Sequence, residues 1–168
     1  MIIFLTGMMG SGKTVVGKAL GEKLGYVFID LDRYLESKAG KSIPEIFRKK
    51  GEAAFRKMES DIQHDPIMNY KNLVVATGGG FPLDRSNREW MKSKGLVIWL
   101  QATPETILKR LGNTSNRPLL PQPVKPSHID EILTKRTFVY KMANYYIQTD
   151  DKTVSEIVHE IFKRINHA

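Results

Sequence analysis

Residues 7–14 read GMMGSGKT and carry the most recognisable chemistry in the chain. They match the pattern G-x-x-x-x-G-K-[ST], the phosphate-binding P-loop. The apolar run at residues 1–5 precedes the loop and is typical of a buried parallel strand. Apolar residues at helical spacing follow the loop as far as Gly25, where we expect the helix to end. Strand, loop and helix together predict a site for nucleotide phosphates.

Each residue type in the loop has a physical role. Glycines let backbone N–H groups approach phosphate oxygens, and the following helix contributes the positive end of its dipole. We expect Lys13 to reach the β- and γ-phosphates and the hydroxyl of Thr14 to bind Mg²⁺. The predicted ATP contacts in the loop are Gly10, Ser11, Gly12, Lys13 and Thr14. The loop does not identify the group that accepts the phosphate.

Two aspartates, Asp30 and Asp32, follow the second predicted strand, residues 26–29. The carboxyl ends of parallel strands are where α/β sheets bind ligands. Carboxylates at this position are suited to Mg²⁺ and to a hydroxyl group. The alternative is that one of them only caps the next helix. The neighbouring P-loop favours a functional role for the pair.

The third predicted strand, residues 73–76, runs into Thr77 and then Gly78, Gly79 and Gly80. Many P-loop proteins end this strand with an acidic residue, and this chain does not. We therefore expect Asp30 and Asp32 to supply the carboxylates of the site. Three consecutive glycines indicate a close approach of the backbone to a ligand or a neighbouring chain segment. A plain flexible turn is the alternative.

Two arginines lie on predicted helices. Arg56 is three residues before Glu59 and four after Glu52, a spacing that favours a surface ion pair. Arg136 falls within an apolar stripe of the helix expected after residue 127. An arginine on a buried face needs an anionic partner. A structural carboxylate and a substrate anion both satisfy that need for Arg136.

Residues 112–127 are rich in proline and asparagine and are not expected to form regular structure. A loop of this length in a compact domain is often an active-site lid. In a phosphoryl-transfer enzyme a lid arginine can close over the transferred phosphate, and Arg117 is the arginine of this loop. An exposed loop arginine without a role is the alternative.

Alternating strand and helix signals predict an α/β protein with a parallel sheet. We expect a single domain, with helices over about residues 31–65 and a lid over about 112–125. Further strands are predicted at residues 96–100 and 144–148, and the capping residues Thr103 and Thr153 predict the starts of two helices.

Composition narrows the function classes. The chain has 168 residues, a net charge of +8 and no cysteine, which excludes disulfides, thiolate metal sites and a cysteine nucleophile. The positive charge suits anionic partners, and because it is spread along the chain, small anions explain it better than nucleic acid. The four histidines show no metal spacing. The start lacks the basic segment of a signal peptide, so we expect a cytoplasmic protein without a membrane partner.

The ordered set of motifs resembles the shikimate kinases, a family of small P-loop kinases. The resemblance covers the whole chain. It rests on the P-loop, D-L-D at residues 30–32, F-R-K-M-E at 55–59, the three glycines, R-P-L-L at 117–120, and Arg136 with Tyr140. It implies a three-layer α/β/α fold with a five-stranded parallel sheet in the order 2-3-1-4-5.

The resemblance also implies an activity, the transfer of the ATP γ-phosphate to the 3-hydroxyl of shikimate, with Mg²⁺ as cofactor. Asp32 would hold the shikimate hydroxyls and act as base, and Arg56 and Arg136 would bind the carboxylate. Gly78, Gly79 and Gly80 would line the substrate. Arg117 and Lys13 would act at the phosphates, Arg110 would contact the nucleotide, and Asp30 would bind Mg²⁺ through water. We expect a monomer.

Two alternatives remain at this point. A kinase of another small hydroxy acid, such as gluconate, would share the P-loop and the lid. A nucleotide-dependent switch or an RNA-binding ATPase would bind or hydrolyse the nucleotide without transferring phosphate to a small molecule. Residues 151–153, near the expected adenine side, do not align firmly with the family.

Overall fold

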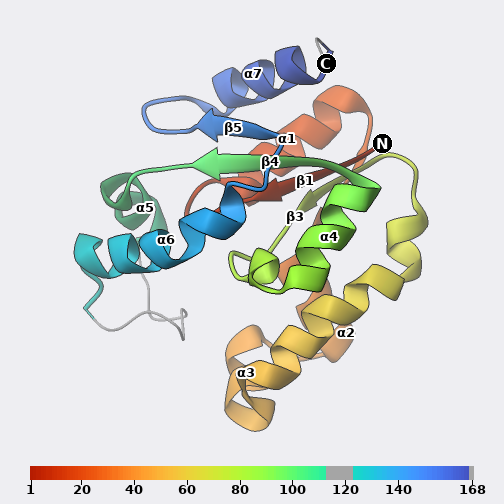
Figure 1. Cartoon of the computed structure of the whole chain (residues 1–168), viewed down its shortest axis with the longest axis vertical. Helices are drawn as coiled ribbons and strands as arrows, with labels where there is room; N and C mark the ends of the chain where they lie inside the picture. Colours follow the sequence, from red (N-terminus) through yellow and green to blue (C-terminus); the bar gives the residue numbers. More distant parts are fainter. Residues whose placement is uncertain (113–122, 167–168) are drawn as a thin grey trace.

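The computed structural model describes residues 1–112 and 123–166, and within these ranges strands and helices alternate as predicted (Figure 1). The strands are β1 (Ile2–Thr6), β2 (Val27–Asp30), β3 (Leu73–Ala76), β4 (Gly95–Gln101) and β5 (Tyr145–Gln148). The α-helices are α1 (Lys13–Leu24), α2 (Leu31–Ala39), α3 (Ile43–Asp61), α4 (Arg85–Lys94), α5 (Pro104–Leu111), α6 (Pro126–Tyr140) and α7 (Val154–Asn166). The short 3-10 helices are η1 (Ile62–His64), η2 (Pro66–Asn69) and η3 (Phe81–Leu83).

The strands form one parallel sheet in the order β2-β3-β1-β4-β5, which confirms the order expected from the family resemblance. All residues of β1 and β3 are buried, as their apolar sequences predict. Leu5 of β1 pairs with Ala76 of β3, and Ala76 pairs with Asp30 of β2. The carboxyl ends of these three strands therefore reach one edge of the sheet at the same level.

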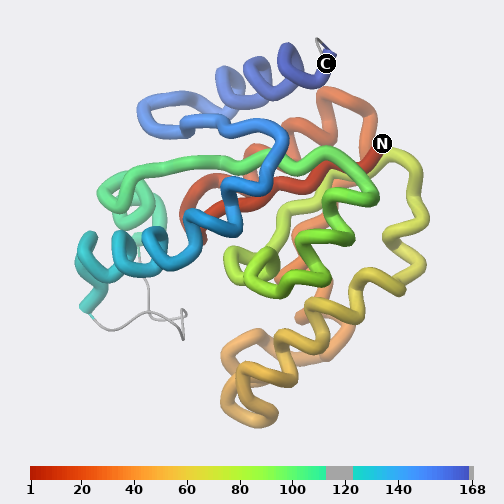
Figure 2. Tube along the Cα trace, in the orientation of Figure 1, coloured from red at the N-terminus to blue at the C-terminus, as the bar shows by residue number. Residues whose placement is uncertain are grey.

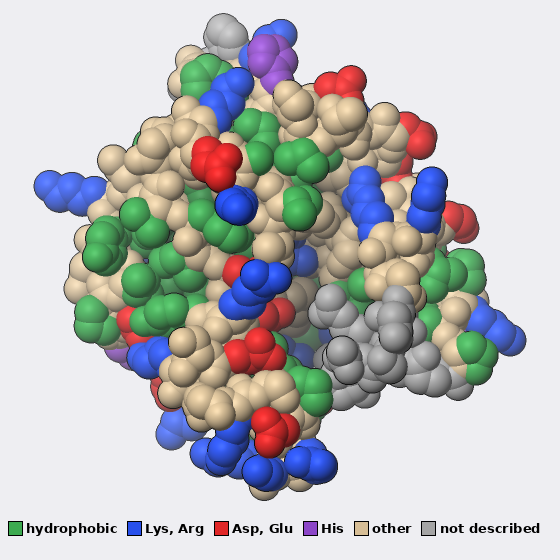
Figure 3. Space-filling model, turned by 180° about the vertical axis from the view of Figure 1, so that it is seen from behind, with side chains coloured by type: hydrophobic (Ala, Val, Ile, Leu, Met, Phe, Trp, Pro, Cys, Tyr) green, Lys and Arg blue, Asp and Glu red, His purple; other side chains and the backbone are tan. Residues whose placement is uncertain are grey.

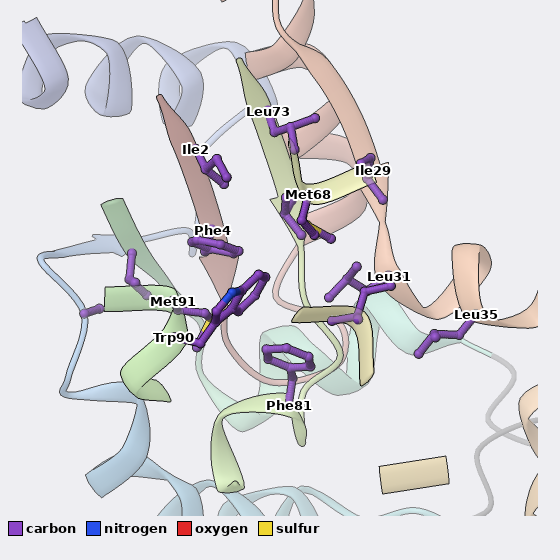
Figure 4. Close-up of a cluster of buried hydrophobic side chains, with 14 of the residues drawn as sticks. Ile2, Phe4, Ile29, Leu31, Leu35, Met68, Leu73, Phe81, Trp90 and Met91 are labelled. Carbon is purple, nitrogen blue, oxygen red and sulfur yellow. The ribbon is translucent and has the colours of Figure 1, made fainter. Parts of the chain in front are cut away.

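Helices cover both faces of the sheet, so the molecule has three layers (Figures 1 and 2). Helices α1 and α7 pack together on one face, where Leu20 and Ile161 are buried against Leu5. The opposite face is covered by a second cluster that includes Phe4, Trp90 and residues of α2, α3, α4 and α6 (Figure 4). Burial on both sides explains why neither face of the central strands carries charge.

Local sequence signals set the ends of several helices. Asp84 and Thr103 cap α4 and α5 with their side chains, and Ser42 forms a capping box with Glu45 at the start of α3. Helix α3 is kinked at Gly51, where the backbone has φ 80° and ψ 169°. Among residues 1–112 and 123–166, no helix is both long enough and apolar enough to span a membrane.

Candidate functional site

The matched ends of β1, β2 and β3 bring three predicted motifs to one cleft. The P-loop follows β1, the two aspartates end β2 and begin α2, and the three glycines follow β3. The cleft has a volume of about 1410 Å³ and is lined by residues from all three motifs and from α3, α5 and α6. Seen from behind, the surface is hollowed near its middle, with charged side chains of both signs around the opening (Figure 3). Segments far apart in the sequence therefore form one cavity.

The P-loop has the backbone that its glycines predict. Gly10 and Gly12 have φ values of 77° and 96°, which side-chain-bearing residues rarely adopt. The Nζ atom of Lys13 donates hydrogen bonds of 2.9 Å to the carbonyl oxygens of Gly7 and Met8, which keeps the ammonium over the loop. The loop leads directly into α1 at Lys13, so the helix N-terminus faces the same space. This part of the cleft is suited to binding phosphates.

The carboxylate of Asp30 makes two contacts, one that caps a helix and one that reaches the P-loop helix. One oxygen caps α2 by accepting a hydrogen bond from the backbone N–H of Arg33, at 3.3 Å. Its second oxygen accepts one from the hydroxyl of Thr14, at 2.5 Å. The two predicted magnesium-site residues are thus in direct contact at the edge of the cleft.

Asp32 lies in the first turn of α2 and lines the same cleft. An ideal Cβ on Gly78 would lie only 2.8 Å from its Oδ1 atom and 2.9 Å from Oε1 of Glu59. A side chain at residue 78 would therefore displace both carboxylates. The first glycine of the three is explained by this close approach and not by a need for a flexible turn.

Gly80 makes room for Arg56, and Gly79 lies beside Arg136. A Cβ on Gly80 would lie 2.5 Å from Nη1 of Arg56, and one on Gly79 would lie 3.5 Å from Nη1 of Arg136. Arg56 comes from α3 and Arg136 from α6, so two guanidinium groups on different helices flank adjacent glycines. Both arginines line the cleft. The structure thereby brings together the predicted carboxylate-binding residues.

The surface ion pair predicted for Arg56 exists in part only. Arg56 contacts the exposed Glu52 at 2.9 Å and also Glu59 at 2.6 Å, but Glu59 is only 2% exposed. The prediction of a surface pair is therefore wrong for Glu59. Helical spacing shows that the two side chains are neighbours, but the packing of α3 against the glycine loop decides that Glu59 points inward.

These observations fit what comparison with known proteins shows. Residues 9–166 match the family model described as shikimate kinase. The chain belongs to the shikimate kinase family. It is 45% identical to the shikimate kinase of Sulfurihydrogenibium sp. (strain YO3AOP1) over 97% of this chain and 96% of that one. It is also 45% identical to the shikimate kinase of Persephonella marina over 97% of this chain and 98% of that one.

Solved structures of the family have the same fold. The shikimate kinase of Acinetobacter baumannii in complex with shikimate matches with a TM-score of 0.93 and 37% identity, over 99% of this chain and 93% of that one. The enzyme of Aquifex aeolicus matches with a TM-score of 0.85 and 35% identity, over 99% of this chain and 96% of that one. The family's three-layer fold and sheet order are therefore those of this chain.

Beside the P-loop, the cleft is lined by Arg110, the predicted nucleotide contact, and by a segment to which the sequence gave no role. Arg110 donates hydrogen bonds to the hydroxyl of Thr149 at 2.9 Å and to its carbonyl at 2.7 Å, and it lies 3.5 Å from the carbonyl of Ser11. The segment that did not align firmly contributes Lys152, Thr153 and Val154 to the lining. Only the tertiary contact between α5 and the segment after β5 shows that this segment belongs to the cleft.

Glu59 also lines the cleft, a place that sequence reasoning did not predict for it, although it ends the quoted F-R-K-M-E motif. Burial raises its pKa to about 7, against the opposing charge of Arg56. This value also includes smaller effects of the neighbouring carboxylate of Asp32, which raises the pKa, and of Arg136, which lowers it. Arg117 and most of the predicted lid lie outside the described residues.

Proposed function

We propose that the chain transfers the γ-phosphate of ATP to the 3-hydroxyl of shikimate, giving shikimate 3-phosphate and ADP. The observation that carries the proposal is one continuous cleft, in which the P-loop adjoins Asp32, Arg56, Arg136 and the glycine loop. This arrangement provides a phosphate site beside a site for an acid that bears hydroxyl groups. The arrangement agrees with the reaction expected of a shikimate kinase.

Two arginines would select the acid. Guanidinium groups bind carboxylates through paired N–H donors, and a neutral sugar or cyclitol offers no matching charge. Arg56 and Arg136 flank Gly80 and Gly79 from different helices, which supports their binding one carboxylate between them. The glycines would let the substrate ring lie against the backbone. Gly78 would leave space for Asp32 to reach the ring hydroxyls.

Asp32 would act on the substrate hydroxyl. An alkyl hydroxyl is a weak nucleophile near neutral pH, and a carboxylate that accepts its proton strengthens it. The hydroxyl oxygen would attack the γ-phosphorus as the bond to ADP breaks. Most of the rate enhancement would come from positioning and from neutralising charge on the phosphates. We propose Lys13 and Arg117 for that role, with Gly10, Ser11, Gly12 and Arg110 holding the nucleotide.

The residues present fit a magnesium ion that arrives with ATP. Mg²⁺ usually keeps several waters and takes one or two carboxylates besides substrate phosphates. Thr14 and Asp30, in contact at the cleft edge, provide one hydroxyl and one carboxylate, and Asp30 would act through water. No cluster of three or more acidic or histidine side chains suited to a metal occurs among the described residues. When bound, the ion would neutralise charge on the β- and γ-phosphates.

We also propose that the chain works as a single-domain, cytoplasmic monomer, without nucleic-acid or membrane partners. Helices α2 and α3 would form the substrate-binding part, and residues 112–125 the lid.

The test is an assay of ADP release with shikimate, gluconate and other hydroxy acids as acceptors. We expect release with shikimate only, and a loss of at least about 100-fold in Lys13→Ala. Lys18→Ala, which removes an exposed lysine from the same helix, serves as the matched control and should retain the wild-type rate. Equal rates with gluconate would favour the alternative kinase. ADP release that is independent of any acceptor would favour a nucleotide switch.

A further inference from the structure

Glu59 is a buried carboxylate that the proposed reaction does not use. Its Oε2 atom accepts a hydrogen bond of 2.6 Å from Nη1 of Arg56 on the same helix. Asp32 faces it from α2 and Arg136 from α6, and its Oε1 atom lies 2.9 Å from the Cβ position of Gly78. Glu59 therefore lies inside the charged cluster that would receive the substrate carboxylate.

When both carboxylates of this cluster are ionised, its charges balance in the free enzyme. Arg56 and Arg136 carry two positive charges, and the carboxylates of Asp32 and Glu59 carry two negative ones. Glu52 also contacts Arg56, but it is exposed and water screens its charge. A substrate carboxylate bound to the two arginines would leave one unbalanced negative charge in a largely buried space. Proton uptake by one carboxylate would restore the balance.

We propose that Glu59 takes up a proton when the substrate carboxylate binds to Arg56 and Arg136. The proton comes from solvent and adds to a carboxylate oxygen of Glu59, and no bond of the substrate changes. The inference rests on the proposed function, because it requires a carboxylate substrate at Arg56 and Arg136.

Glu59 is the group of this cluster best placed to take up the proton. Burial raises its pKa to about 7, so that near neutral pH a substantial fraction of free enzyme molecules still carries it ionised. A second carboxylate that competes for Arg56 would raise this pKa further. In the pH range between the free and bound pKa values, each binding event then consumes up to one proton. Shikimate affinity should fall as pH rises through this range, by at most about tenfold per pH unit.

The experiment is titration calorimetry of shikimate binding to the full chain at pH 7.5 in buffers with different ionisation enthalpies. The dependence of the observed heat on the buffer counts the protons taken up. We expect uptake of a fraction of a proton by the wild type and none by Glu59→Gln. Glu52→Gln removes the other carboxylate on Arg56 and is the matched control, in which the uptake should persist.

Three outcomes would contradict the inference. Wild-type binding without proton uptake between pH 7 and 8 would leave Glu59 a static partner of Arg56, and this measurement does not depend on how the variants fold. Equal uptake in Glu59→Gln would assign the proton to another group. If Glu52→Gln lost the uptake to the same extent, removal of either carboxylate beside Arg56 would abolish it, and the uptake could not be assigned to Glu59. A wild type that binds no shikimate at all would instead refute the proposed function, and with it this inference.

Discussion

The hydroxyl of Tyr140 donates a 2.6 Å hydrogen bond to the carbonyl oxygen of Gly79, joining residues 61 positions apart in the sequence. Tyr140 is fully buried at the end of α6, one turn after Arg136. Burial raises the pKa of its hydroxyl, although the nearby positive charge of Arg136 opposes the shift. The hydroxyl thus stays a donor at neutral pH. The bond fixes the helix that carries Arg136 against the loop that the substrate would contact.

Arg136→Lys should weaken shikimate binding by about 10- to 100-fold, because lysine keeps the charge but lacks the two-pronged donor geometry. ATP affinity should change little, since the P-loop is untouched. The melting temperature should also change little, because Arg136 lines an open cleft. Calorimetry and thermal unfolding on the same variant measure all three quantities.

The control for this variant is Arg85→Lys, at a side chain that is 83% exposed and paired with Glu89 away from the cleft. It should leave both ligand affinities at the wild-type level. Normal shikimate affinity in Arg136→Lys, together with a lower melting temperature, would show that Arg136 is structural.

Asp32→Asn should lower turnover by roughly 100-fold or more and ATP affinity much less. The amide keeps the shape of the carboxylate but loses its charge and its ability to accept a proton. Steady-state kinetics with shikimate, and nucleotide binding measured separately, give the two effects. Unchanged turnover would remove Asp32 from the role of base.

Gly80→Ala should reduce shikimate affinity by between about 10- and 100-fold while the chain still folds. The added methyl would lie 2.5 to 2.9 Å from the guanidinium of Arg56, which must move away. Gly80 has φ −94°, which alanine adopts without strain, and the displaced group is the flexible end of a side chain. A melting temperature close to that of the wild type is therefore expected. Retained affinity would mean that Arg56 does not need its present position.

Glu59 should make the protein less stable as pH rises from 4.5 to above 7. Its pKa is about 7 in the folded chain, against an ordinary value of 4.5, so the folded state binds more protons in this range. The contribution is fully present below pH 4.5 and is lost as pH rises through 7, a total of about 3 kcal/mol.

Urea unfolding of the wild type and Glu59→Gln at pH 5 and pH 8 checks this sign. Because glutamine does not titrate, the free energy of unfolding should shift in favour of the variant by about 2 to 3 kcal/mol between the two pH values. Parallel pH profiles of the two proteins would show that Glu59 stays ionised in the folded chain.

Local sequence determined the fold class and the two ligand motifs at the strand ends. Alternating apolar strands and amphipathic helices leave few arrangements other than a parallel sheet covered on both faces, because each apolar face must be buried. The P-loop and the aspartates at residues 30 and 32 are recognisable because their chemistry depends on residues that are close in the chain. The strand order came from the family resemblance, since no local pattern specifies which strands pair.

Tertiary structure alone decided which charged residues meet. The spacing of Arg56 and Glu59 made them neighbours on a helix, but only the packing of that helix on the glycine loop buries the carboxylate and raises its pKa. For Arg136, sequence left a structural and a substrate partner open. The Tyr140–Gly79 hydrogen bond holds α6 against the glycine loop and so places Arg136 beside Gly79 and in the cleft. Burial, charge and pKa depend on contacts between distant segments, and a linear pattern of residue types does not contain those contacts.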